Sequence, residues 1–129
     1  MEMAIDIGLG RGTPREKMVE IGERIGAGLH VAEAIPSAFG FFAANDGDAM
    51  GSIIGAVNVG YDTDTIATMS GAIAGAYRGA KAYPEHFLPT LEQANHLEIA
   101  KLAEDLTAIA TKRLEQRGMR KREEGGCDE

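Results

Sequence analysis

The sequence has little cysteine, few aromatic residues and a deficit of positive charge, and each shortage excludes a class of protein. Cys127 is the only cysteine, so no disulfide can form within the chain, and we expect a reducing, cytoplasmic compartment. The 20 acidic residues outnumber the 13 basic ones, which is not the composition of a nucleic-acid-binding surface. Residues 49–61 form one of the longest uncharged runs, which is too short and too rich in small residues to span a membrane. We therefore expect neither a nucleic-acid partner nor a membrane partner, and we see no signal peptide.

Strand patterns are also scarce. Few stretches alternate apolar and polar residues, whereas glycine and alanine are abundant. Apolar residues instead recur at helical spacing, as at Met18, Ile21, Ile25 and Leu29. We therefore predict an all-α fold, in a chain whose 129 residues allow one domain at most.

Capping residues and prolines predict the helix boundaries. Thr13 before Pro14 predicts a helix that begins at Pro14 and runs to about residue 27. A second helix is expected over 30–44, where Pro36 either kinks it or splits it. Asp48 can cap a third helix that reaches about residue 57, and Asp62 or Thr63 opens a fourth that lasts to about residue 79.

The ends of the chain differ from its middle. Residues 1–13 are interrupted by glycine and predict a loop or a truncated element. Residues 14–115 contain no linker and predict one helical region, with a helical stretch from Thr90 and amphipathic spacing over 97–113. Residues 116–129 mix charge with glycine and predict a disordered tail.

The segment GYDTDT, residues 60–65, places two carboxylates at the start of the fourth helix. Side chains at a helix start can fold back toward the first turn, so Asp62, Asp64 and Thr65 can converge on one small volume. Carboxylate and hydroxyl oxygens suit Mg²⁺, Mn²⁺ or Ca²⁺. The alternative is simple helix capping, which is common for aspartate. The apolar flanks and nearby glycine favour a ligand site, and both interpretations stay open.

Two further features have structural interpretations. Gly71, Gly75 and Gly79 recur every fourth residue and predict close packing of a neighbouring helix. Glu33 lies on an otherwise apolar helix, and we expect it on a solvated face rather than as a catalytic acid. The sequence assigns no catalytic residue.

The string AVNVGYDTDTIATMSGAIAGAYRG, residues 56–79, resembles the C-terminal signature of the ADP-ribosylglycohydrolase family. The upstream EKMVEIGERIGAGLHVAEAIPSAFGFF and the downstream AEDLTAIA are similar to the helices that flank this signature. The similarity covers roughly residues 8–112 and corresponds to the C-terminal half of the helical family fold.

The resemblance implies a function. Family members bind two Mg²⁺ ions at the base of an ADP-ribose cleft and hydrolyse the glycosidic bond of ADP-ribosylated substrates. By this resemblance Asp62, Asp64 and Thr65 would be metal ligands, with Asp64 the better candidate for a ligand shared by both ions. Asn58 and Gly60 would contact the substrate, although Asn58 could equally serve only to end the preceding helix.

Two departures from the family pattern leave other functions open. Tyr61 stands where the family often has glycine or a small polar residue, and its ring could change the cleft wall or the backbone. The second acidic motif and the catalytic glutamate of the family do not occur in these residues. The chain could therefore work with a separate N-terminal half or by self-association, or persist as an inactive helical interaction module. A Mg²⁺-dependent phosphoryl-transfer enzyme with Asp62 as nucleophile is a further alternative.

Overall fold

The computed structural model describes residues 1–124, and the surroundings of side chains through residue 118. Seven α-helices and one short 3₁₀ helix occur in this range, and no strand does, so the all-α prediction is confirmed. None of the helices in it is long and apolar enough to cross a bilayer. The chain forms two compact units, Met1–Pro84 and Glu85–Glu129, so the region expected over 14–115 is divided between them.

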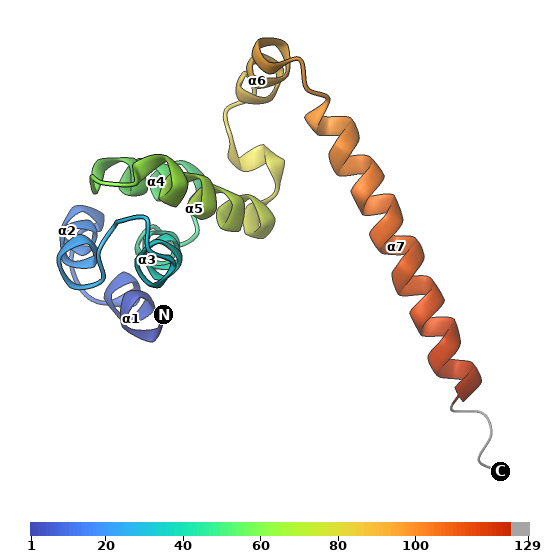
Figure 1. Cartoon of the computed structure of the whole chain (residues 1–129), viewed down its shortest axis with the longest axis horizontal. Coiled ribbons are helices and arrows are strands. Elements are labelled where there is room, and N and C mark those ends of the chain that lie inside the picture. Colours follow the sequence, from blue (N-terminus) through green and yellow to red (C-terminus); the bar gives the residue numbers. More distant parts are fainter. Residues whose placement is uncertain (125–129) are drawn as a thin grey trace. The chain divides into compact units, whose positions relative to one another are not determined.

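The first unit is a helical assembly with α3 at its centre (Figure 1). α3 packs against each of the other four α-helices of this unit. The elements are α1 (Glu2–Leu9), α2 (Pro14–Arg24), α3 (Val31–Ala44), α4 (Ala49–Asn58), α5 (Thr63–Arg78) and η1 (Ala80–Ala82).

Local capping determines where two of these helices begin. The Thr13 hydroxyl accepts a hydrogen bond from the backbone N–H of Glu16, and the Glu16 carboxylate accepts one from the backbone N–H of Thr13. This reciprocal capping box satisfies two N–H groups that would otherwise lack partners. At α4 the Asp48 carboxylate accepts from the N–H of Gly51 at 2.6 Å. Both predicted helix starts are confirmed.

Residues 1–13 were predicted as a loop or a truncated element, and the loop alternative is wrong for α1, which is helical from Glu2 to Leu9. Its Gly8 lies against α3 so closely that a Cβ atom there would be 2.7 Å from both the Ala43 Cβ and the Gly40 carbonyl oxygen. Contacts with α3, and not local propensity, therefore hold this glycine-containing segment in a helix.

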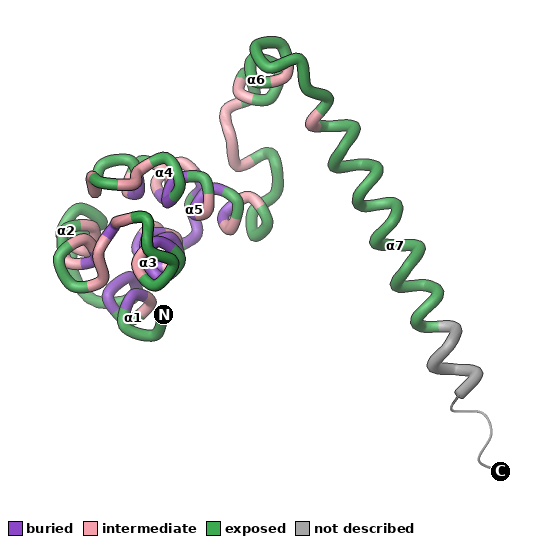
Figure 2. Tube along the Cα trace, viewed as in Figure 1, coloured by how far each residue is buried: buried purple, intermediate pink, exposed green. Residues whose placement is uncertain are grey.

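The core of this unit is built from small side chains around a few large ones. Phe41, Ile21 and Ile66 are the largest apolar side chains that are fully buried, and alanines from α3, α4 and α5 fill the space between them. Figure 2 shows the buried residues on the helix faces that point inward. Pro36 does not split α3, which is continuous, because its ring is buried in this core and packing offsets the lost intrahelical hydrogen bond.

The glycine stripe of α5 has three different surroundings. A Cβ at Gly71 would be 3.1 Å from Ile53 Cδ1 of α4, so this glycine allows close helix packing as predicted. A Cβ at Gly75 would instead be 2.8 Å from the hydroxyl oxygen of Tyr83, which donates a hydrogen bond to the Gly71 carbonyl oxygen. Gly79 caps the C-terminus of α5 with a φ of +82°. The prediction of one helix-packing surface therefore holds for Gly71 only.

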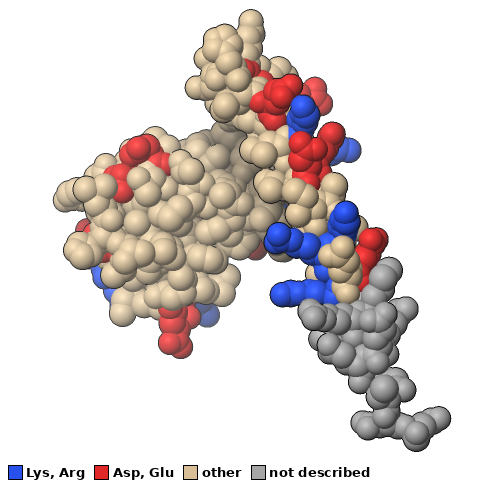
Figure 3. Space-filling model, turned by 45° about the vertical axis from the view of Figure 1, so that its right-hand side comes forward, with Lys and Arg blue, Asp and Glu red and all other residues tan. Residues whose placement is uncertain are grey.

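The second unit contains α6 (Phe87–Asn95) and α7 (Ile99–Glu124). α6 begins three residues before the predicted Thr90, because Pro89 falls in the first turn, where its missing N–H costs no hydrogen bond. α7 continues to Glu124, so the disorder predicted over 116–129 is wrong for residues 116–124, which lack proline. The remaining five residues lie outside the described range. Figure 3 shows charged side chains of both signs along α7.

Candidate functional site

The predicted site lies where the chain passes from α4 to α5. α4 ends at Asn58, and Asp62 is the residue immediately before α5. Two consecutive residues of this turn have positive φ angles, +93° at Gly60 and +60° at Tyr61. The turn directs the chain into α5, whose first three residues are Thr63, Asp64 and Thr65.

A hydrogen bond from a distant loop fixes the position of Asp62. Its backbone N–H donates to the carbonyl oxygen of Ala27 at 2.9 Å. The residues on both sides of Ala27 are themselves held by α3. The Gly28 N–H donates to the Glu33 carboxylate at 2.9 Å, and the Ser37 hydroxyl donates to the Gly26 carbonyl oxygen at 2.6 Å. Through this loop, α3 positions the start of α5.

The Asp62 side chain is not a helix cap. It accepts no hydrogen bond from the first turn of α5, in contrast to Asp48 at the start of α4. Its Oδ2 atom is buried and has no hydrogen-bond partner among the described residues. Burying an unpaired carboxylate oxygen is unfavourable, and such an atom in a native structure requires an explanation, such as a bound water or ion.

Asp64 and Thr65 are both exposed at the start of α5. Among the described residues, neither Asp62 nor Asp64 forms an ion pair, so both carboxylates are available to a cation. The same residues contain no group of three or more His, Cys, Asp or Glu side chains that could hold a metal ion. The oxygens of this segment therefore suit a hard cation in kind but are too few to surround it, since such ions take about six.

The two predicted substrate contacts have different surroundings. A Cβ atom at Gly60 would have no atom within 4 Å, so the space beside this backbone is open. Asn58 is exposed, and its side-chain amide donates to the Ile54 carbonyl oxygen at 2.7 Å. The Asn58 amide therefore bonds back onto its own helix.

Residues that support the site were missed by the sequence analysis. Glu33 was expected on a solvated face, but it is half-buried and holds the Gly28 N–H. Ser37 is fully buried and holds the Gly26 carbonyl. The paired glycines around Ala27 were the only local signal of a tightly bound loop, because the contact with Asp62 joins residues far apart in sequence.

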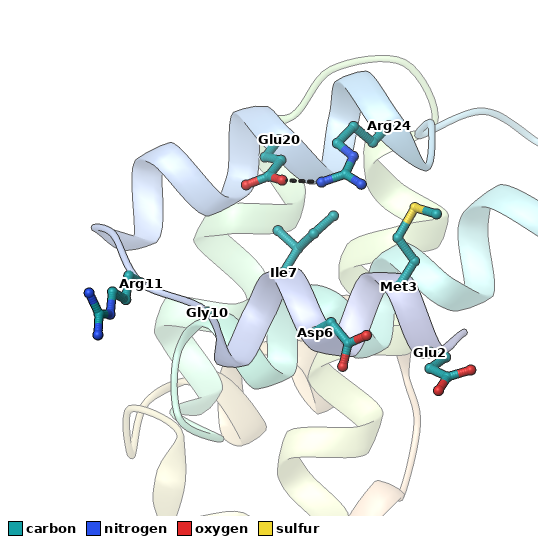
Figure 4. A pocket seen from close by; sticks show the side chains of 8 residues that line it. All are labelled: Glu2, Met3, Asp6, Ile7, Gly10, Arg11, Glu20 and Arg24. Atoms are coloured by element: carbon teal, nitrogen blue, oxygen red, sulfur yellow. Dashed lines mark hydrogen bonds and ion pairs between the residues drawn. The ribbon is translucent and has the colours of Figure 1, made fainter.

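A separate groove lies between α1 and α2, with a volume of about 520 Å³ (Figure 4). Figure 4 shows the ion pair between Glu20 and Arg24 on the α2 side and the carboxylates of Glu2 and Asp6 on α1. None of the predicted site residues lines this groove. It is therefore distinct from the segment that carries the family signature.

Comparisons with known proteins agree with the resemblance seen in the sequence. A model of the ADP-ribosylglycohydrolase family matches residues 3–117. The human (Homo sapiens) ADP-ribosylhydrolase ARH3 is 33% identical over 103 residues, which are 72% of this chain and 28% of that protein. The Bos taurus ARH3 is 31% identical over 105 residues, 74% of this chain and 28% of that protein. An uncharacterized protein of Archaeoglobus fulgidus is 39% identical over 79 residues, 59% of this chain and 24% of that protein.

These matches cover most of this chain, whereas the chain spans only about 28% of the length of the ARH3 proteins. No solved structure matches the chain significantly. The family match covers the first unit from residue 3 onward, including the GYDTDT segment at the start of α5. The chain belongs to the ADP-ribosylglycohydrolase family.

Proposed function

We propose that this chain supplies metal ligands for a Mg²⁺-dependent hydrolase that cleaves the glycosidic bond of ADP-ribosylated substrates. The observation that carries the proposal is the buried Oδ2 atom of Asp62, which has no partner among the described residues, within the family signature. The ARH3 relatives are named ADP-ribosylhydrolases, which supports ADP-ribose compounds as the substrate class.

The donor set fits Mg²⁺ in its chemistry. Asp62, Asp64 and Thr65 offer carboxylate and hydroxyl oxygens, the ligands that hard cations prefer. With two ions, Asp64 would be the shared ligand. Since the described residues lack a complete cluster, water and groups beyond these residues would supply the remaining ligands. A separate N-terminal half or a second copy of the chain could provide such groups.

The turn before α5 would receive the reacting ribose. Bound Mg²⁺ would orient ribose hydroxyls, help activate water and stabilise charge as the bond at the anomeric carbon breaks. Gly60 leaves open space in which a ligand can approach the backbone. Asn58 would contact the substrate from the end of α4 while its amide remains bonded to the Ile54 carbonyl oxygen. The hydrogen bond from the Asp62 N–H to the Ala27 carbonyl oxygen would help to keep the Asp62 carboxylate in place during the reaction.

Two other functions give different experimental results. An inactive helical remnant would fold but would not hydrolyse the substrate. A phosphoryl-transfer enzyme would use Asp62 as a nucleophile at the end of a buried strand, and residues 1–124 contain no strand. Covalent trapping of Asp62 by beryllofluoride would support that enzyme class alone.

The proposal is tested by incubating the chain with an ADP-ribosylated peptide and measuring release of ADP-ribose. Where a second copy of the chain completes the site, we expect release that requires Mg²⁺, stops with EDTA and is abolished in Asp64→Ala; where a separate N-terminal half is required, the folded chain alone releases none. Asp105→Ala removes an exposed carboxylate from α7 and serves as the matched control, which should leave the rate unchanged. Equal release by parent and Asp64→Ala, or release that is unaffected by EDTA, would refute the proposed metal role.

A further inference from the structure

Tyr61 has a strained backbone conformation and a side chain that is almost fully exposed. Its φ angle of +60° lies in the left-handed region, which is unfavourable for a bulky residue but is accessible to glycine without steric strain. Its side chain is 90% exposed. Residues kept in such conformations are concentrated at functional sites, so the observed outlier is a reason to look for a function.

The ring of Tyr61 does not offset this strain through contacts within the first unit. The other two tyrosines of the chain do make such contacts. Tyr77 packs edge-to-face on Phe42, with ring centroids 5.5 Å apart, and the Tyr83 hydroxyl donates to the Gly71 carbonyl oxygen. For Tyr61, the structure shows neither an aromatic pair nor a side-chain hydrogen bond among the described residues. Its ring is therefore available to a partner outside the unit.

The position of Tyr61 identifies what that partner is. It directly precedes Asp62, whose buried Oδ2 atom has no partner among the described residues, and it follows the open space at Gly60. In the proposed function, which this inference rests on, the metal ligands hold the ribose whose anomeric carbon reacts. An exposed residue beside these ligands is placed where it can meet the group joined to that carbon, because a protein acceptor must reach the site from solvent.

We propose that the ring of Tyr61 packs against the acceptor group of the ADP-ribosylated substrate and contributes to the choice of acceptor. An exposed aromatic face can cover an apolar or peptide surface, and it attracts a cation such as a guanidinium. Tyr61 is thus a specificity residue that contacts the acceptor, the group that leaves when the glycosidic bond breaks, and it takes no part in the cleavage.

The test compares Tyr61→Asn with Tyr61→Phe. Asparagine tolerates the left-handed conformation and removes the ring, whereas phenylalanine keeps the ring and removes the hydroxyl. With Mg²⁺, each variant is compared by its Kd for free ADP-ribose and by its KM for an arginine-linked and a serine-linked ADP-ribosyl peptide. We expect Tyr61→Asn to weaken binding of at least one peptide by about tenfold, as for a contact at the centre of an interface. Binding of ADP-ribose should change less than about twofold, because it lacks the acceptor.

Thermal unfolding of the same variants provides a readout that is independent of binding. Because the ring makes no contact within the unit, the melting temperature of Tyr61→Asn should be unchanged or higher. A lower melting temperature would show that Tyr61 is a structural residue and would overturn the inference. Equal weakening for ADP-ribose and both peptides, or no weakening for any, would also overturn it. If the parent binds none of the three ligands, the proposed function fails, and the inference fails with it.

Discussion

The backbone N–H of Asp62 donates a hydrogen bond to the carbonyl oxygen of Ala27, with the two atoms 2.9 Å apart. This bond connects the start of α5 to the loop between α2 and α3. The loop is fixed in turn by the Glu33 carboxylate and the Ser37 hydroxyl of α3. The position of the signature carboxylate therefore depends on residues that precede it by 25 to 35 positions.

Removing the Glu33 carboxylate should release this loop. Glu33→Ala leaves the half-buried Gly28 N–H without its acceptor, and we expect the free energy of unfolding to fall by about 1–2 kcal/mol. Glu33→Gln retains an acceptor oxygen, so its free energy of unfolding should fall by less. Urea unfolding followed by circular dichroism measures both, with the exposed Glu23→Ala of α2 as the matched control. A loss no larger than that of Glu23→Ala would show that the hydrogen bond between the Glu33 carboxylate and the Gly28 N–H does not stabilise the fold.

The stability of the chain should respond differently to the same substitution at Asp48 and at Asp62. Asp48→Ala removes a carboxylate that accepts the Gly51 N–H, so stability should fall by about 1 kcal/mol. Asp62→Ala removes no capping hydrogen bond and relieves an unpaired buried oxygen, so stability should change little or rise. Both are measured by urea unfolding without divalent ions. Equal losses at the two positions would mean that Asp62 is an ordinary cap.

Adding one methyl group at Gly8 should disrupt the contact between α1 and α3. A Cβ atom there would be 2.7 Å from the Gly40 carbonyl oxygen, so the helices must separate, and we expect a loss of about 1–3 kcal/mol. In Gly55→Ala the new Cβ meets its nearest atoms at 3.5 Å, an ordinary contact. That control should be neutral or stabilising by up to about 1 kcal/mol, since alanine favours helix. Thermal unfolding distinguishes the two, and a neutral Gly8→Ala would contradict the close packing.

Tyr83 should make the stability of the first unit sensitive to high pH. Burial of its hydroxyl raises the pKa of Tyr83 above the ordinary value of 10.0, although a hydrogen bond with the Gly75 backbone opposes the shift. A raised pKa in the folded state means that the neutral hydroxyl is favoured there. Its stabilisation is complete below pH 10.0 and is lost as the pH rises through the folded-state pKa.

The measurement is the difference in unfolding free energy between the parent and Tyr83→Phe from pH 8 to pH 11. Comparing the two chains removes the contribution of lysine titration, which they share. We expect the advantage of the parent to shrink above pH 10.0, while a constant difference would show that ionisation of Tyr83 does not affect the fold.

The predictable parts of this fold are those with local causes. Thr13 and Asp48 cap the helices that follow them through bonds within three residues, and the sequence predicts both helix starts. α1 was not predicted, because its helix depends on the contact of Gly8 with α3 rather than on its own composition.

The candidate site likewise has features that the sequence predicts and features that it does not. The carboxylates at positions 62 and 64 stand out in the sequence, as does their position at a helix start. The hydrogen bond between Asp62 and Ala27 could not be predicted, because Ala27 contributes only its backbone carbonyl and its side chain gives no indication of the contact. The positive φ of Tyr61 was equally hidden, because glycine is the residue that usually indicates this conformation.

The most direct test of the account is calorimetric titration of ADP-ribose into the folded chain with excess Mg²⁺, beside the same titration of Asp64→Ala. If the carboxylates that begin α5 hold the ion that organises the ribose, the parent binds only with Mg²⁺ and Asp64→Ala does not bind. Absence of binding by the folded parent, or equal binding by Asp64→Ala, would contradict the account.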